Sequence, residues 1–153
     1  MGSYNFKSVG KKASTPSTAP TVTALPIGIK TPLQLSDNGI FAMHYNLADQ
    51  VHDNLRNLLL TNWGERLGFY YFGANLRELT SEISNIDAFD STAIERIRTA
   101  VSTWMPFVVL KDFTSTVDNS NNLNTGIVKI AITYSVSQLN IENRALQISL
   151  YVI

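Results

Sequence analysis

The sequence predicts an α+β fold in which about three helices cover a three-stranded antiparallel sheet at the C-terminal end of the chain. Three observations lead to this fold class. Between residues 46 and 105, apolar residues recur at spacings of three and four, as on one face of a helix. From residue 107 onward the spacing falls to two, which is typical of strands with one buried face. Residues 1 to 40 show no helical period and predict an extended arm, although a disordered tail is an equal alternative for residues 1 to 20.

Composition limits the classes of function that the chain can have. Its 153 residues, 44% of them hydrophobic, suffice for the core of one ordinary domain. Twelve basic and twelve acidic residues cancel, so no net charge favours nucleic acid or an anionic membrane as a partner. The absence of cysteine excludes disulfides, thiolate zinc sites and a cysteine nucleophile. No apolar run has the length of a membrane span or a signal peptide, so we expect no membrane contact.

The N-terminal region differs in composition from the rest. Residues 1 to 40 hold every proline except Pro106 and many Ser and Thr, and cannot bury enough apolar surface to offset their conformational entropy. Residues 24 to 33 are more apolar and are expected to lie against other structure. We therefore divide the chain into an arm over 1–40 and a domain over 41–153.

The first predicted helix begins at Asn46, and Gly64 supplies a left-handed stop just past its end. A second, short helix is predicted after Asn75, because Asn75 and Glu78 have the spacing of a capping box. The apolar stripes of these helices are Leu47, Val51, Leu55, Leu58 and Leu59, and then Leu76, Leu79 and Ile83.

The third predicted helix starts at a cap formed by Asp90 or Thr92, with Glu95 reaching back toward the Thr92 amide. Pro106 ends it, since proline offers no amide and restricts Met105 before it. Its buried stripe is Ile94, Ile97, Val101 and Trp104.

Three strands are predicted over residues 107–117, 127–136 and 145–153. Their short connections favour an antiparallel meander. A sheet this small has edges with unpaired amides, and a long apolar edge is normally covered or used to pair with another chain. The inward side chains are Val128, Ile130, Ile132, Tyr134 and Val136 on the second strand, and Leu146, Ile148, Leu150 and Val152 on the third.

The connection between the first two helices combines Glu65, Arg66 and four aromatic residues at positions 69 to 72. A glycosidase needs two opposed carboxyl groups roughly 5 to 10 Å apart, one of them with a raised pKa. Arg66 would lower the pKa of Glu65, and Glu78 and Glu82 share a solvated helix face. We expect no catalytic residue here.

Other chemistries also lack their motifs. His44 and His52 have no carboxylate at metal-ligand spacing, so they are expected to be solvated or packed histidines. The glycines of the connection are not followed by the Gly-Lys-Ser/Thr of a phosphate loop. Its aromatic residues lack the interleaved basic residues that nucleic-acid stacking requires. We expect neither metal nor cofactor, and the aromatic residues fit core packing or a protein interface better.

Glu65 and Arg66 leave two interpretations open. They can close a structural ion pair within the fold, or they can present a charged fork to a partner protein.

The stretch LLLTNWGERLGFYYFGANLRELTSE carries an ordered pattern: Leu-x-Thr, two residues, Gly-Glu-Arg, a later Phe-Gly, then Leu-x-x-Leu and a Glu. It resembles the signature of the baseplate wedge and sheath-initiator proteins of contractile phage tails, often called gene-25-like lysozymes, which have a counterpart in type VI secretion baseplates. Tyr70 stands where that family has proline, and the match covers roughly residues 45 to 153. The pattern positions are Leu59, Thr61, Gly64, Glu65, Arg66, Phe72, Gly73, Leu76, Leu79 and Glu82.

One departure affects the expected partner contact. The family ends its third helix with an aromatic residue and Glu-Pro-Arg, whose charges hold it to a helical bundle of neighbouring wedge subunits. This chain has Trp104-Met105-Pro106-Phe107, so both charges are absent. If the same surface is used, its contact must be apolar. The residues expected to bind a partner are Glu65, Arg66, Met105, Pro106 and Phe107.

The resemblance implies a non-enzymatic subunit of the virion tail baseplate, assembled in the host cytoplasm. Its partners would be other wedge proteins, through their helical core bundle, and the first ring of sheath protein, which would build on a strand edge by β-augmentation. Two alternatives stay open: a tail-associated cell-wall hydrolase that needs Glu65, and a type VI secretion baseplate component. The expected augmenting strand is Leu146, Gln147, Ile148, Ser149, Leu150 and Tyr151.

Overall fold

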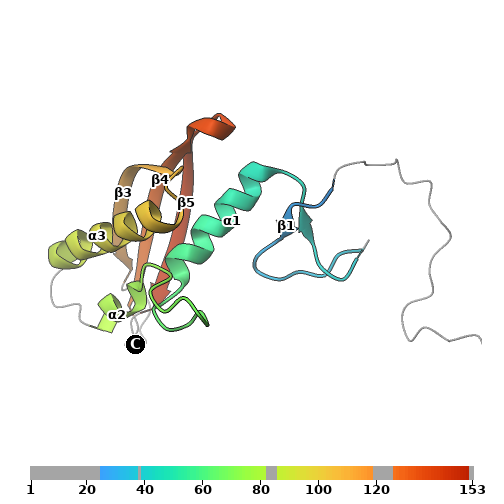
Figure 1. Cartoon of the computed structure of the whole chain (residues 1–153). Helices are drawn as coiled ribbons and strands as arrows, with labels where there is room; N and C mark the ends of the chain where they lie inside the picture. The colour runs from blue at the N-terminus through green and yellow to red at the C-terminus, as the bar shows by residue number, and fades with distance from the viewer. Residues whose placement is uncertain (1–24, 38, 82–85, 119–125, 152–153) are drawn as a thin grey trace, which may run out of the picture.

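The fold is that of a computed structural model, which describes residues 25–37, 39–81, 86–118 and 126–151. Residues 1–24 of the predicted arm, and also Glu82, Ile83 and Val152, lie outside the described residues. The elements in chain order (Figure 1) are β1 (Gly28–Ile29), β2 (Met43–His44), α1 (Leu47–Leu60), α2 (Leu76–Ser81), α3 (Ile86–Trp104), β3 (Val109–Asp118), β4 (Ile127–Val136), a 3-10 turn (Ser137–Leu139) and β5 (Ile141–Tyr151).

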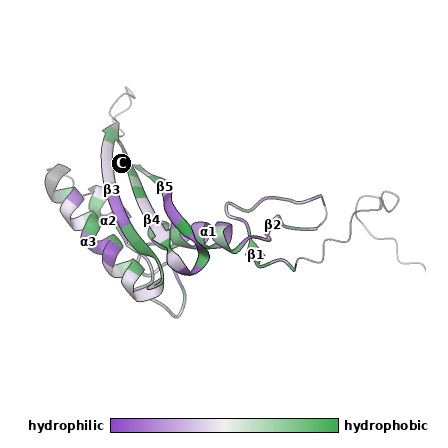
Figure 2. Ribbon diagram, turned by 90° about the horizontal axis from the view of Figure 1, so that it is seen from above, coloured by the Kyte–Doolittle hydropathy of each residue, from purple (hydrophilic) through white to green (hydrophobic). Residues whose placement is uncertain are grey.

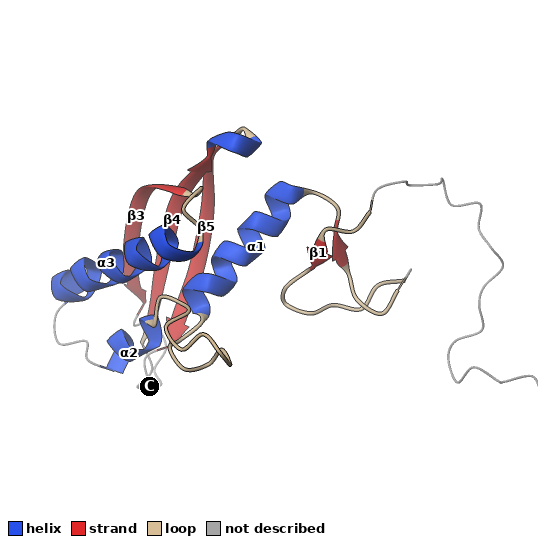
Figure 3. Cartoon of the chain, in the orientation of Figure 1, coloured by secondary structure: helices blue, strands red, loops and turns tan. Residues whose placement is uncertain are grey.

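The three C-terminal strands form one antiparallel sheet in the order β3-β4-β5, which confirms the predicted α+β meander (Figure 3). β5 begins at Ile141, four residues before its predicted start. Asn140 adopts a left-handed conformation directly after the 3-10 turn and reverses the chain there, so pairing resumes with Ile141 opposite Val136. Asn143 also has a positive φ, and the register shifts between Tyr134 and Val136.

The helices cover one face of this sheet (Figure 1). α1 and α2 pack against β5, α3 packs against β3, and α1 also contacts α3. Hydrophobic and hydrophilic residues alternate along the strands (Figure 2), as expected when one face is buried. The described inward side chains of the predicted strands are all buried: Val128, Ile130, Ile132, Tyr134, Val136, Leu146, Ile148 and Leu150.

Two predictions about the first two helices were wrong in detail. α1 ends at Leu60. The next residue, Thr61, is extended, and its N–H and hydroxyl both donate to Asn57 O, so Gly64 is not the stop of this helix. Gly64 instead takes its positive φ inside the following loop. In the predicted capping box, Glu78 accepts from the Asn75 side-chain amide, because the Asn75 backbone N–H donates to Thr61 O.

The third helix begins earlier than predicted. It runs from Ile86 to Trp104, so Asp90 and Thr92 lie inside it and do not cap it. Asp90 accepts a hydrogen bond from the Ser115 hydroxyl of β3. The predicted stop before Pro106 is confirmed. Ile94 and Trp104 of the predicted stripe are only half-buried. From residue 89 onward, the buried residues of this helix are Phe89, Ala93, Ile97, Ala100 and Val101.

The described part of the N-terminal region extends from the start of α1 away from the sheet (Figure 1). β1 pairs with β2, and residues 24–33, which we expected to lie against other structure, contact β2 and α1 in their described part. The Asp53 carboxylate of α1 accepts from Thr31 N at 2.9 Å and bonds His44 Nε2 at 2.7 Å. The boundary at residue 40 stays a prediction.

Asp53→Ala is expected to loosen this attachment. A hydrogen bond to a charged group contributes about 1.5–3 kcal/mol, so local opening should increase about tenfold or more. The measurement is the rate of tryptic cleavage after Lys30. Asp37→Ala, a change at an exposed aspartate, is the control and should leave the rate unchanged. Equal cleavage rates in the two variants would show that Asp53 does not hold the N-terminal segment to α1.

The same contact should depend on pH. Burial opposes ionisation of Asp53, but hydrogen bonds from Thr31 and His44 outweigh it and lower the pKa of this carboxyl below its usual value. A lowered folded-state pKa means that the stabilisation is present above about pH 4 and is lost as the pH falls through the folded pKa. The Thr31 amide should then lose its protection from hydrogen exchange.

Candidate functional site

The loop over residues 61–75, which we call the aromatic loop, is held by its own backbone hydrogen bonds. Gly64 N donates to Tyr70 O at 2.8 Å, and Phe69 N donates to Arg66 O at 3.1 Å. Gly73 has φ +108 and lies so close to Thr61 that an added Cβ would be 2.1 Å from Thr61 O. Only glycine fits such a close approach at a positive φ. The loop therefore has a defined shape.

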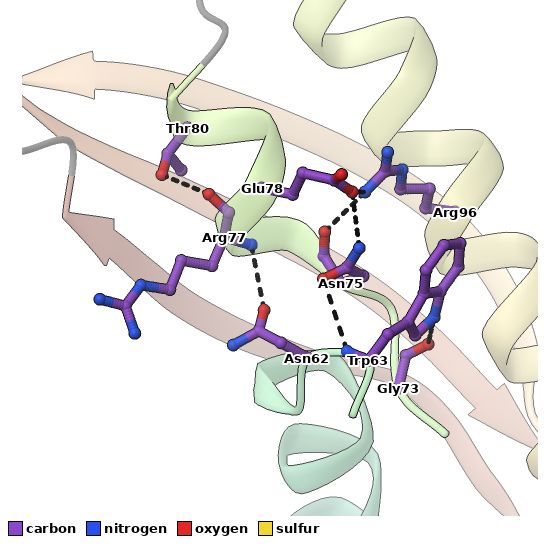
Figure 4. Close-up of polar contacts among 8 residues, drawn as sticks. All are labelled: Asn62, Trp63, Gly73, Asn75, Arg77, Glu78, Thr80 and Arg96. Atoms are coloured by element: carbon purple, nitrogen blue, oxygen red, sulfur yellow. Dashed lines mark hydrogen bonds and ion pairs between the residues drawn. The ribbon is translucent and has the colours of Figure 1, made fainter. Parts of the chain in front are cut away.

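A polar network joins this loop to α2 and α3 (Figure 4). Asn75 Oδ1 accepts from Trp63 N, and Asn75 Nδ2 donates to Glu78 Oε2 at 2.6 Å. Arg96 Nη1 of α3 donates to Glu78 Oε2 and to Asn75 O, both at 2.8 Å. Asn62 Oδ1 accepts from Arg77 N at 3.3 Å. We predicted that Glu78 would cap α2 and lie on a solvated face, but its carboxylate also joins the aromatic loop to α3.

Glu65 is exposed and is bonded locally. Its Oε2 accepts from Asn62 N and its Oε1 from Asn62 Nδ2, each at 2.8 Å. The hydrogen bonds from the Asn62 side chain and backbone, with a smaller effect of the Arg77 charge, lower the pKa of Glu65 below its usual value. We expected the charge of Arg66 to lower the pKa of Glu65. The pKa is lowered, but Asn62 and Arg77 cause the shift and Arg66 does not. Glu65 is therefore an ionised carboxylate with both oxygens in use.

Arg66 forms no ion pair with Glu65. Its guanidinium carbon lies 4.2 Å from the centroid of the Phe72 ring and 5.7 Å from that of Phe69. Such cation–π contacts hold a guanidinium in place without using its N–H donors. Within the part of the chain that the structure describes, Arg66 makes no hydrogen bond or ion pair. The interpretation of Glu65 and Arg66 as a structural ion pair with each other is wrong.

Four of the five predicted partner-binding residues meet at one groove of about 690 Å³, which we call the α1–α3 groove. Phe107 is 38% exposed, and Met105 is buried at the wall. Pro106 is exposed at the same turn but does not line the groove. The contribution of α1 side chains to this groove was not predicted. The groove is lined by Asn54, Asn57, Leu58, Thr61, Glu65, Arg66, Phe72, Trp104, Met105 and Phe107.

The predicted augmenting strand lies on β5, at one side of the sheet. Leu146, Ile148 and Leu150 point into the core, and Gln147, Ser149 and Tyr151 are exposed on the other face. Among the described residues, β4 is the only strand that pairs with β5. The outer edge of β5 therefore carries backbone groups that no described strand satisfies.

The aromatic loop also exposes large side chains, as the interface interpretation of its aromatic residues expects. Leu67 is fully exposed, and Trp63, Tyr70 and Tyr71 are largely exposed. Trp63 is held by a hydrogen bond from Nε1 to Gly73 O at 3.3 Å and by Arg96 over its ring at 5.5 Å. Exposed aromatic groups on an ordered loop are typical of protein interfaces. The expectation of core packing holds only for Phe72, which packs partly buried against the core.

The two described carboxylates near the loop, those of Glu65 and Glu78, do not form an acid–base pair with one raised pKa. Glu65 and Glu78 line a common cavity of about 460 Å³. Each is already bonded to neutral or cationic donors, Glu65 to Asn62 and Glu78 to Asn75 and Arg96. A general acid needs a raised pKa, and that of Glu65 is lowered.

The two histidines serve packing. His44 is buried against Asp53, and His52 bonds the Tyr134 hydroxyl through Nδ1 at 2.9 Å. Burial, and then the Arg144 charge, lower the pKa of His52, so it is neutral at pH 7. The described residues contain no group of three or more side chains suited to a metal ion. They also include no helix that is long and apolar enough to span a bilayer.

The fold and the site define a class: an α+β domain in which helices cover one face of a three-stranded meander. A groove with both apolar and polar walls lies beside α1 and the end of α3. Two solved structures share the fold. A chain of the cryo-EM structure of the anti-feeding prophage baseplate is 21% identical, with a TM-score of 0.57 over 72% of this chain and 84% of that one. A protein from Geobacter sulfurreducens, assigned by name as a tail lysozyme, is 21% identical, with a TM-score of 0.51 over 72% and 94%.

No protein-family model matches the sequence, and no curated protein matches it either. At 21% identity the two structural matches establish a common fold only.

Proposed function

We propose that this chain is a structural subunit of a contractile-tail baseplate that binds neighbouring wedge proteins and starts the assembly of the sheath. The fold that it shares with a chain of the anti-feeding prophage baseplate supports a baseplate role. The motif resemblance of residues 45 to 153 supports the wedge and sheath-initiator assignment within it. The protein would act in the virion tail and not as an enzyme.

The observation that carries the proposal is the α1–α3 groove. Residues from the aromatic loop and from the turn after α3, far apart in sequence, come together beside α1 with apolar side chains on the walls. Met105 and Phe107 stand where the resembling family has Glu and Arg, so apolar contact replaces charge at this turn. Apolar grooves rimmed by polar groups are typical docking sites for proteins.

The sheath contact is proposed for the edge of β5. Strand addition needs an unpaired edge and outward backbone groups and requires no catalytic geometry. The stretch Leu146 to Tyr151 has an inner face anchored in the core, so the edge is held rigidly. A sheath strand would add beside it.

Phe107→Asp is expected to weaken baseplate assembly while leaving the isolated fold intact. The ring is partly exposed, so the aspartate can be solvated in the free chain but would be desolvated against an apolar partner. With the flanking genes expressed together, we expect at least about tenfold less of the variant in purified particles. Gln138→Asp, exposed on the 3-10 turn and not part of the groove lining, is the charge-matched control. Equal incorporation of the two variants into particles would show that the α1–α3 groove is not part of the interface.

A tail-associated cell-wall hydrolase is the second candidate, because one structural match carries a lysozyme name. It predicts that the purified chain cleaves peptidoglycan and that Glu65→Gln abolishes the cleavage. The bonded state of Glu65 predicts no cleavage by either form. A type VI secretion baseplate component would use the same surfaces, and the neighbouring genes separate it from a phage protein.

A further inference from the structure

Arg66 is fixed at the wall of the α1–α3 groove with its donors unused. The guanidinium lies against the ring of Phe72, 4.2 Å from its centroid, and both side chains line the groove. A guanidinium has five N–H donors in a planar fork that matches a carboxylate. No described residue accepts any of them. The side chain is thus held in position for an acceptor that this part of the chain does not supply.

Glu65, the other charged residue at the groove, does not pair with Arg66. Glu65 uses one oxygen for Asn62 N and the other for Asn62 Nδ2. These hydrogen bonds hold the Glu65 carboxylate against Asn62 in the aromatic loop, whereas the Arg66 guanidinium lies over the ring of Phe72. The groove therefore offers one pre-positioned cation beside apolar side chains, mainly Phe72, Trp104 and Phe107.

From this arrangement we propose that the α1–α3 groove binds a segment of a neighbouring baseplate protein that carries apolar side chains and one carboxylate, Asp or Glu, which pairs with Arg66 in a two-pronged contact. This inference rests on the proposed function and names the chemistry of its partner. Apolar side chains of the segment fill the space beside Phe107 and Trp104. The carboxylate sets the register of the segment in the groove, because a planar fork accepts it in few orientations.

A nucleic acid or free phosphate fits the same site less well. Binding along a phosphate backbone requires several basic groups, and Arg66 is the only basic residue that lines this groove among the described residues. Glu65, an ionised carboxylate at the same groove, would repel the phosphates of a nucleic acid. An acidic, apolar polypeptide satisfies both features of the groove.

Cross-linking can test the proposed carboxylate directly. In Arg66→Lys the introduced amine should lie within reach of the partner carboxylate, and a carbodiimide should join the two as an amide in assembled particles. Mass spectrometry of particles made with the flanking genes should find a link from position 66 to an Asp or Glu of another chain. Arg98→Lys, exposed on α3 outside the groove, is the matched control and should give no such link. Links at both positions, or at neither, would overturn the proposal.

Incorporation of charge variants separates this inference from the proposed function. We expect Arg66→Glu to reduce the chain in particles about tenfold or more, Arg66→Gln to reduce it less, and Arg66→Lys least, with unchanged thermal unfolding of the free chain. If Phe107→Asp blocks incorporation while Arg66→Glu does not, the carboxylate proposal fails and the baseplate role stands. If the unaltered chain is absent from particles, both the baseplate role and the proposed carboxylate contact are wrong.

Discussion

Ile148→Lys is expected to remove most of the free energy of unfolding of this domain. Ile148 lies on β5 opposite Ile130 of β4, and the two side chains are 3% and 0% exposed. A lysine there would place an ammonium in the core, and none of the acidic residues belongs to the buried set of the described chain. An unpaired buried charge costs several kcal/mol, and a domain of this size is stable by only about 5–15 kcal/mol. Urea unfolding followed by circular dichroism measures the loss.

Gln147→Lys is the matched control, because residue 147 is the next position on the same strand and points to solvent. We expect it to change the free energy of unfolding by about 0.5 kcal/mol or less. A large loss in the control, or a parent-like unfolding curve for Ile148→Lys, would mean that the inward face of β5 is assigned wrongly.

Gly73→Ala is expected to destabilise the aromatic loop and the domain by about 3 kcal/mol or more. The residue has φ +108, and a Cβ there would stand 2.1 Å from Thr61 O. An alanine would force the backbone apart where Thr61 O accepts from Asn75 N, and strained backbone conformations alone cost about 1–3 kcal/mol. The free energy of unfolding and the near-ultraviolet circular dichroism of the aromatic loop measure the change.

Gly68→Ala separates the cost of a positive φ from the cost of a steric clash between the new Cβ and Thr61. Gly68 also has a positive φ, +80, but nothing lies within 4 Å of its built Cβ. We expect it to lose only about 1–2 kcal/mol, the cost of a left-handed alanine. Equal losses in the two variants would show that the close approach of Gly73 to Thr61 does not contribute.

The sheet was the most predictable part of the fold. The predicted inward residues of β4 and β5 follow a period of two, and the bounds of β4 were predicted without error. The start of β5 was not, because it depends on a left-handed Asn140, and asparagine adopts that conformation only in particular contexts. The start of α3 was missed for a related reason: Asp90 looks like a cap, but its carboxylate bonds Ser115 of β3, a contact between residues 25 positions apart.

The candidate site was predictable in its members but not in its geometry. The motifs indicated Glu65, Arg66 and Phe107 separately, and only the folded chain places them at one groove. The Glu65 bonds to Asn62 span three residues and could have been inferred from local sequence. The position of Arg66 over Phe72 could not, because it depends on the turns of the whole aromatic loop.

The attachment of the N-terminal segment was likewise beyond sequence reasoning. Asp53 reaches Thr31, 22 residues earlier, and no local pattern marks either as a partner of the other. The alternation of apolar residues near residue 27 indicated only that this segment contacts something.

Cryo-electron microscopy of an assembled particle, at a resolution that shows side chains, tests the central claim most directly. We expect the α1–α3 groove to lie beneath a neighbouring baseplate protein, with Phe107 covered and a carboxylate of that protein beside Arg66. The total buried area should exceed about 1,000 Å², as in stable interfaces. A groove left open to solvent in the particle, or one that holds a glycan between Glu65 and a second acid, would contradict this account.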